Sequence, residues 1–68
     1  MPLSARNHLQ GEITDVLLGT VTALVTVKVG NNVIESVITR RSAEELKLKK
    51  GDRVTAVIKA TEVMIQKD

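Results

Sequence analysis

The segment Ser4-Ala5-Arg6-Asn7 places a hydroxyl and a guanidinium two positions apart near the start of the chain. Side chains two apart on an extended strand project to the same side, so Ser4 and Arg6 would share one face. Both groups donate hydrogen bonds, and arginine adds a permanent charge on a planar fork. No carboxylate lies within these four residues. The pair therefore suits a small oxyanion better than a cation, although solvated surface is the commoner role for such residues.

Further hydrogen-bond donors follow at two later points of the chain. Thr39 ends a predicted strand and Ser42 begins a predicted helix, where free backbone N–H groups favour an anion. Lys59, Ala60 and Thr61 offer an ammonium, backbone N–H groups and a hydroxyl at the end of another predicted strand. Each also has an ordinary role, since Ser42 can be only a helix N-cap and Lys59 only a solvated strand residue. Two neighbouring cations add positive potential beside Thr39, namely Arg40 and Arg41.

Catalysis and metal binding find little support in the residue types. There is no cysteine, and His8 is the only histidine. The chain has no glycine-rich phosphate loop and no His-Glu-x-x-His motif. We therefore predict that the protein is not an enzyme, that it uses no cofactor, and that no direct metal-ion ligands are present.

The composition indicates a small domain that needs partners. The chain has 68 residues and no Phe, Trp or Tyr, so a single copy can bury only a small core. We predict a homo-oligomer whose subunit contacts complete the core.

The start of the chain lacks the features of a signal peptide, and no apolar run is long enough for a membrane span. A soluble, cytoplasmic protein with no membrane partner is expected.

Nucleic acid is a weaker alternative. The net charge is only +2, and single-strand binders of the OB type stack bases on aromatic rings that this chain lacks.

Residue periodicity predicts five strands and one helix in a single domain spanning residues 1–68. β-Branched residues alternate with polar ones from 20 to 29, and Gly30-Asn31-Asn32 then forms a hairpin turn. Leu24, on the otherwise polar face, is interpreted as a subunit contact.

Ser42 and Glu45 match a capping box for a short helix ending near Lys47-Leu48. The remaining strands are expected at 9–16, where Gly11 marks a bulge or close backbone approach, and at 33–39, 53–60 and 63–65. Many short strands with one helix predict an all-β fold, a five-stranded OB-like Greek-key barrel.

Three segments together resemble the molbindins, a family of small molybdate-binding proteins. They are Ser4-Ala5-Arg6-Asn7, the run from Val37 to Ser42, and Val57-Ile58-Lys59-Ala60-Thr61. The resemblance covers essentially the whole chain and implies a hexamer, a trimer of dimers, that stores molybdate or tungstate at sites between subunits. By matching positions, Ser4 and Arg6 would come from one chain. Its neighbour would supply Thr39, Ser42, Lys59 and the backbone N–H of Ala60. Secondary candidates, including those for a site on the three-fold axis, are Asn7, His8 and Thr61.

The chemistry of the ligand agrees with this donor set. Molybdate and tungstate are tetrahedral dianions that accept hydrogen bonds, and charge-assisted bonds from Arg6 and Lys59 would be the strongest contacts. The leading hypothesis is non-covalent oxyanion binding for intracellular storage. One alternative is an oxyanion-sensing interaction domain that regulates a partner protein. A single-stranded nucleic-acid binder is the other.

Overall fold

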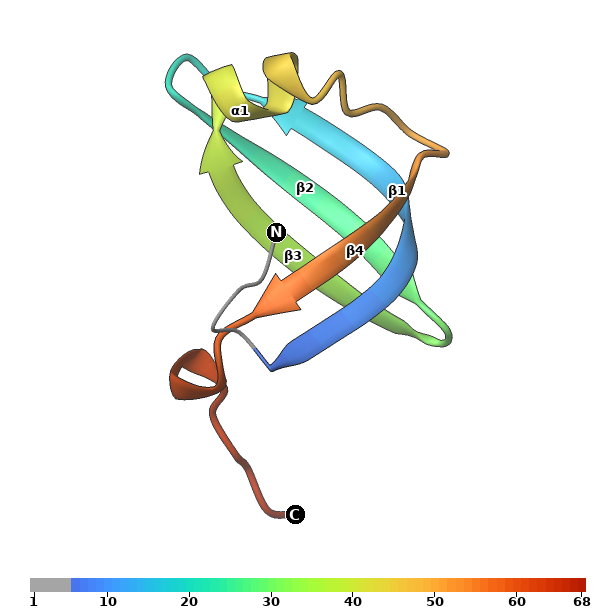
Figure 1. Cartoon of the computed structure of the whole chain (residues 1–68), viewed down its shortest axis with the longest axis vertical. Helices are drawn as coiled ribbons and strands as arrows, with labels where there is room; N and C mark the ends of the chain where they lie inside the picture. The colour runs from blue at the N-terminus through green and yellow to red at the C-terminus, as the bar shows by residue number, and fades with distance from the viewer. Residues whose placement is uncertain (1–5) are drawn as a thin grey trace.

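The alternating β-branched runs form four antiparallel strands in the computed structural model, which describes residues 6–68 (Figure 1). The sheet order is β3-β2-β1-β4. The elements, in chain order, are β1 (Asn7–Leu18), β2 (Thr22–Val29), β3 (Asn32–Thr39), α1 (Arg40–Glu45), β4 (Arg53–Ile58) and the short 3₁₀ helix η1 (Ala60–Glu62). None of the helices in this part of the chain has the length and apolar character needed to cross a membrane.

Strand β1 is the longest and joins the two halves of the sheet. Its first half pairs with β4, from Asn7 opposite Ile58 to Glu12 opposite Arg53. Its second half pairs with β2, ending at Leu18 opposite Ala23. The curled sheet that results carries α1 over one end, whereas β1 begins at the other end (Figure 1).

The backbone of β2 passes close to Gly11, which confirms one of the two roles predicted for this glycine, but the β-bulge lies elsewhere. A Cβ at this position would lie 2.5 Å from the carbonyl oxygen of Lys28 on the neighbouring strand. The register of β1 against β2 shifts between Ile13 and Asp15, so the irregularity falls at Thr14 instead. Only glycine fits where the two backbones come so close.

The core lies on the concave face of the sheet and is built from small and medium aliphatic side chains. Alternate positions of β2 point inward as the sequence predicted, and the predicted turn after β2 forms, with Gly30 at a φ of 60°. Leu24 lies on the opposite face of β2 from these inward positions. Among the described residues, the buried hydrophobic ones are Ile13, Ala23, Val25, Val27 and Ala43.

The predicted all-β fold with one short α-helix is confirmed, but the prediction of a five-stranded OB-like Greek-key barrel is wrong in its strand count and in the barrel. There are four strands in the described part of the chain, and β3 and β4 stand at opposite edges of the sheet without pairing to each other. The expected last strand at 63–65 does not form, because residues 63–68 run away from the sheet after η1 (Figure 1). Met64 is 93% exposed. A strand needs a neighbouring edge for its hydrogen bonds, and this segment reaches none within its own chain.

The predicted capping box is also wrong, because the helix begins earlier. Thr39 is the N-cap of α1, and its side chain accepts a hydrogen bond from the backbone N–H of Ser42. The helix ends before Lys47, which adopts a φ of 53°. The N–H of Lys47 donates to Glu44 and that of Leu48 to Ala43, which is the Schellman pattern.

Candidate functional site

The predicted donors fall into two groups at opposite ends of β1. Arg6 directly precedes β1, and Lys59 directly follows β4. Because Asn7 pairs with Ile58, Arg6 and Lys59 leave the same end of this strand pair. Thr39 lies at the other end, opposite Thr22 and beyond the last residues of β1. We call Arg6, Lys59, Ala60 and Thr61 the terminal cluster, and Thr39 with Ser42 the hydroxyl pair.

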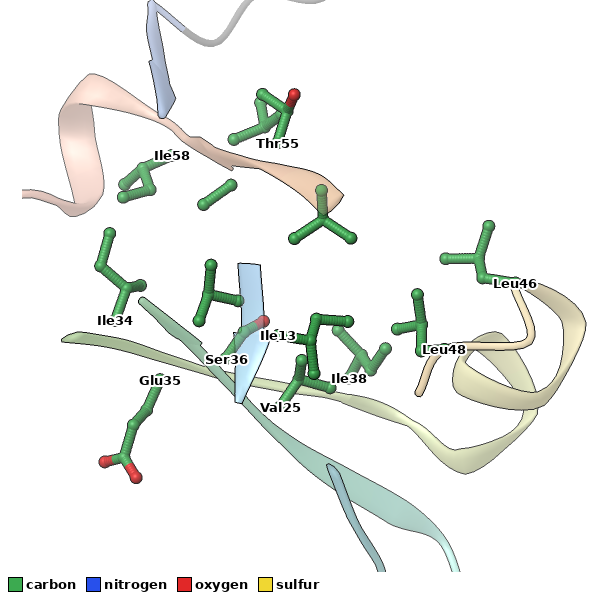
Figure 2. Close-up of a pocket in the computed structure, with 14 residues that line it drawn as sticks. Ile13, Val25, Ile34, Glu35, Ser36, Ile38, Leu46, Leu48, Thr55 and Ile58 are labelled. Atoms are coloured by element: carbon green, nitrogen blue, oxygen red, sulfur yellow. The ribbon is translucent and has the colours of Figure 1, made fainter. Parts of the chain in front are cut away.

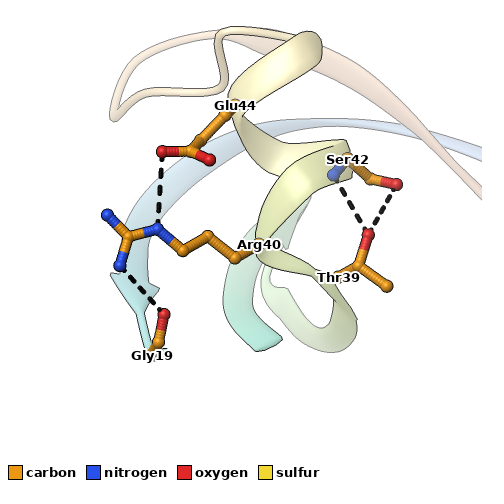
Figure 3. A network of polar contacts seen from close by, with 5 residues as sticks. All are labelled: Gly19, Thr39, Arg40, Ser42 and Glu44. Carbon is orange, nitrogen blue, oxygen red and sulfur yellow. Dashed lines mark hydrogen bonds and ion pairs between the residues drawn. The ribbon is translucent and has the colours of Figure 1, made fainter. Parts of the chain in front are cut away.

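The hydroxyl pair is held by two short hydrogen bonds (Figure 3). The backbone N–H of Ser42 donates to Thr39 Oγ1 at 3.0 Å. The Thr39 hydroxyl donates in turn to Ser42 Oγ at 2.8 Å. With the Thr39 proton used in this way, the Ser42 hydroxyl has its own proton left to donate to a ligand. The arrangement makes Ser42 a hydrogen-bond donor, which suits an anion.

Arg40 fixes this pair in place (Figure 3). Its backbone N–H donates to the carbonyl oxygen of Val21 at 2.8 Å, and Nη1 donates to that of Gly19 at 3.3 Å. The Nε atom of Arg40 lies 3.4 Å from a carboxylate oxygen of Glu44. The start of α1 is thereby attached to the β1–β2 turn. The sequence predicts positive potential or an ordinary surface role for Arg40 but not this contact, because a bond to Gly19, 21 residues earlier, has no local sequence signal.

Nearby carboxylates offset part of the charge of both arginines beside the hydroxyl pair. Arg40 pairs with Glu44, and Arg41 Nε lies 3.1 Å from Glu45 Oε1. Each pair spans one helical turn and is largely exposed, so its energetic value is small. The two arginines and the two glutamates together carry no net charge, so these ion pairs add little positive potential at the hydroxyl pair.

The terminal cluster is exposed and rich in donors. Lys59 is the N-cap of η1, and Ala60 begins this helix, so the N–H of Ala60 has no partner within it. The side-chain amide of Asn7 donates to the carbonyl oxygen of Ile58 at 3.2 Å, which joins the ends of β1 and β4. His8 lies opposite Val57 on an exposed position of β1. The predicted ligand Ser4 lies outside the described residues.

The structure thus brings Arg6 near Lys59 and Thr39 near Ser42, but it does not bring the two groups together within one chain. The resemblance to molbindins assigned Thr39, Ser42, Lys59 and Ala60 to one subunit; these four are divided between the two ends of β1. Within one chain, therefore, a small ligand contacts one of these two groups and not both.

A groove of about 410 Å³ opens between the edge strands β3 and β4 (Figure 2). Ile34 on β3 faces Ile58 on β4 across it, whereas Glu35 points away. Glu35 is the only charged residue of the lining. An apolar groove cannot replace the hydration of a dianion, so this is not the oxyanion site. In addition, no group of three His, Cys, Asp or Glu residues within 6–68 could hold a metal ion.

Comparison with known proteins adds independent information. The TOBE domain family matches residues 3–65. Molybdenum-pterin-binding protein 1 of Clostridium pasteurianum is 47% identical over 66 residues, which cover 96% of this chain and 97% of the relative. The structure of a molybdate-binding protein from Sporomusa ovata superposes with a TM-score of 0.94 at 36% identity, covering 98% of this chain and 100% of the other. The cytoplasmic molybdate-binding protein ModG, solved with molybdate bound, gives a TM-score of 0.82 at 41% identity over 88% of this chain and 43% of its own.

Proposed function

This chain belongs to the molbindin family of TOBE-domain proteins, and from that premise we propose that it binds molybdate, or tungstate, without catalysing a reaction. The proposed role is storage of the oxyanion in the cytoplasm, by a single domain of residues 1–68. The structural similarity to the molybdate-binding protein of Sporomusa ovata supports oxyanion binding, and the similarity to the cytoplasmic protein ModG supports a cytoplasmic location.

The observation that carries the proposal is the chemistry of the two donor groups. The hydroxyl pair and the terminal cluster supply hydroxyls, backbone N–H groups and two cations, and a tetrahedral dianion accepts hydrogen bonds from all of them. Because they lie at opposite ends of β1, we place the site between copies, with the terminal cluster of one copy facing the hydroxyl pair of another. Ser4 is proposed to add its hydroxyl beside Arg6.

Two apolar surfaces support the proposed homo-oligomer. One is the groove between β3 and β4, which a single chain leaves open. The other is the segment 63–68, in which Met64 and Ile65 are exposed. A small core without aromatic residues gains stability if neighbouring copies cover such surfaces. We propose a hexamer, arranged as a trimer of dimers.

The names of several relatives mention a molybdenum-pterin rather than the bare anion. A pterin is an aromatic ring system, and recognition of such rings commonly uses stacking on aromatic side chains. This chain has none. The donor set is therefore proposed to hold the oxyanion itself.

The proposal is tested by native mass spectrometry and calorimetry with sodium molybdate. We expect Arg6→Ala and Ser42→Ala each to weaken binding at least tenfold, equivalent to about 1.4 kcal/mol or more. Arg41→Ala is the matched control, because Arg41 is 88% exposed and pairs only with Glu45 among the ion pairs of the described residues. Unchanged affinity in both test variants, or no binding by the wild-type oligomer, would contradict the proposal.

A sensing role is the second candidate. It predicts that an immobilised wild-type protein captures a partner only when molybdate is present. Storage alone predicts the same captured proteins with and without the anion.

A further inference from the structure

The two neighbouring arginines at the start of α1, Arg40 and Arg41, differ in one contact. Each forms an ion pair with the glutamate one helical turn later. Among the hydrogen bonds of the described residues, only those of Arg40 also reach the β1–β2 turn, where its Nη1 donates to the carbonyl oxygen of Gly19. The side chain of Arg40 is 43% exposed, whereas that of Arg41 is 88% exposed. A role that Arg40 does not share with Arg41 must therefore come from the turn, because the charges and ion pairs are alike.

The bond from Arg40 completes a closed loop of contacts around the β1–β2 turn. The N–H of Gly19 donates to the carbonyl oxygen of Thr22 at 2.7 Å, and Thr22 pairs with Thr39 between β2 and β3. The backbone N–H of Arg40 then donates to Val21, and its Nη1 returns to Gly19. Thr39, the first member of the hydroxyl pair, is a link in this loop, so a shift of the turn would also move the hydroxyl pair.

Helix α1 is too short to hold its own orientation. Isolated helices of fewer than about 12 residues are marginal in water, and α1 has 6 residues. Ala43 is the buried residue of α1, and an alanine side chain offers little apolar surface for packing. The direction in which the Ser42 hydroxyl points therefore depends on the polar contacts that attach the start of the helix to the sheet.

We propose that Arg40 is a positioning residue for oxyanion binding, which holds the Ser42 hydroxyl in place through the β1–β2 turn. In Figure 3 the guanidinium of Arg40 points toward Gly19 and away from the hydroxyl pair, so Arg40 acts through that pair and not as a ligand. Donors in a binding site must be held within about 0.5 Å of their productive positions, which is why such a support affects affinity. The inference rests on the proposed function, since it takes Ser42 as a ligand of molybdate.

Arg40→Met tests the inference, and Arg41→Met is its matched control. Methionine keeps an unbranched side chain and a high helix propensity, and both variants lose one charge and one ion pair. Calorimetry with sodium molybdate should show binding weakened about fivefold or more by Arg40→Met, the equivalent of one typical hydrogen bond, and scarcely changed by Arg41→Met. Arg40→Lys should recover part of the loss, because an ammonium can still donate to the turn. Equal affinities of the two methionine variants would overturn the inference.

A double-mutant cycle with Ser42→Ala separates positioning from a general loss of structure. If Arg40 acts through Ser42, adding Arg40→Met to Ser42→Ala should weaken binding by less than about twofold further. A purely structural role predicts instead that the losses of affinity multiply, and that result would overturn the inference. Far-UV circular dichroism reports whether each variant remains folded.

Gly19→Ala tests the turn without changing any charge, and it replaces Arg40→Met should that variant not fold. An added Cβ would lie 3.0 Å from the carbonyl oxygen of Thr22, so the turn must shift to make room. Binding should weaken as in Arg40→Met, and wild-type affinity would overturn the inference. No molybdate binding by the wild-type protein would overturn the proposed function as well, whereas a loss in Ser42→Ala with none in Arg40→Met would overturn this inference alone.

Discussion

Replacing Gly11 by alanine should destabilise the sheet where its two halves meet. Gly11 is a buried residue of β1, and an added methyl group would approach three atoms of β2. The distances are 2.5 Å to the carbonyl oxygen of Lys28, 2.8 Å to Val27 Cγ1 and 2.9 Å to Val29 Cγ2. Comfortable carbon contacts are about 3.5–4.0 Å, so each contact overlaps by more than half an ångström.

The size of the loss in the free energy of unfolding depends on which atoms can move to relieve the overlap. Lys28 O belongs to the backbone of β2, and Val27 is part of the core, so relief requires β2 to shift away from β1. Overpacking of this kind costs about 1–3 kcal/mol, and we expect a value near the upper end, about 3 kcal/mol. For a domain of this size that corresponds to a fall in Tm of roughly 12–24 °C.

Urea unfolding followed by far-UV circular dichroism measures the loss, since the chain has no aromatic fluorophore. All variants must be compared at one protomer concentration, because association stabilises the folded state. Gly30→Ala is the control: Gly30 has a φ of +60° but no atom within 4 Å of an added Cβ, so it tests backbone strain without crowding, at a cost of about 1–2 kcal/mol. If Gly11→Ala unfolded at the same urea concentration as Gly30→Ala, or at a higher one, the argument from crowding would be refuted.

Two further predictions concern the ends of α1. Thr39→Ala removes the N-cap and should lower stability by about 1 kcal/mol, whereas Thr39→Ser keeps the hydroxyl and should lose much less. Thermal unfolding distinguishes the two, and equal losses would mean that the hydroxyl is not what stabilises the helix. Lys47→Gly should raise stability by about 1 kcal/mol, because the left-handed conformation at a φ of 53° suits glycine better than lysine. Lys50→Gly is the control with no such gain; a Lys47→Gly protein no more stable than the wild type would contradict this interpretation.

Local patterns in the sequence were sufficient for much of the fold. Alternation at Ala23, Val25 and Val27 correctly predicted both β2 and its buried face. The turn at Gly30 was predicted because few residues other than glycine and asparagine tolerate its conformation. These features depend on residues close together in the chain, which is why they could be recognised without a structure.

The errors concern choices that depend on distant parts of the chain. Thr39 and Ser42 are both good N-cap residues, and the register of Thr39 against Thr22 on β2 decides where β3 stops and the helix starts. The segment 63–65 has the composition of a strand, but a strand also requires an available edge, which composition does not reveal.

In the candidate site, too, the residue types could be predicted from the local sequence, whereas their arrangement in space could not. The residue types at Arg6, Thr39, Ser42 and Lys59 predicted an oxyanion ligand, and the relatives are named for molybdenum or molybdate. Which donors lie near one another could not be predicted, because it depends on the pairing of Asn7 with Ile58, 51 residues apart. The role of each residue as a ligand stays a prediction, to be decided by the binding experiments above.

The length of β1 has a consequence for how the amount of bound molybdate would depend on the amount of protein that a cell makes. A solitary chain offers an anion either the hydroxyl pair or the terminal cluster, since the strand holds them apart. Capacity would then rise more steeply than the amount of protein, because each site needs copies to meet. By thermodynamic linkage the anion would also draw the copies together. Cells that make few copies would hold scarcely any molybdate, and a modest increase in expression would create the reservoir.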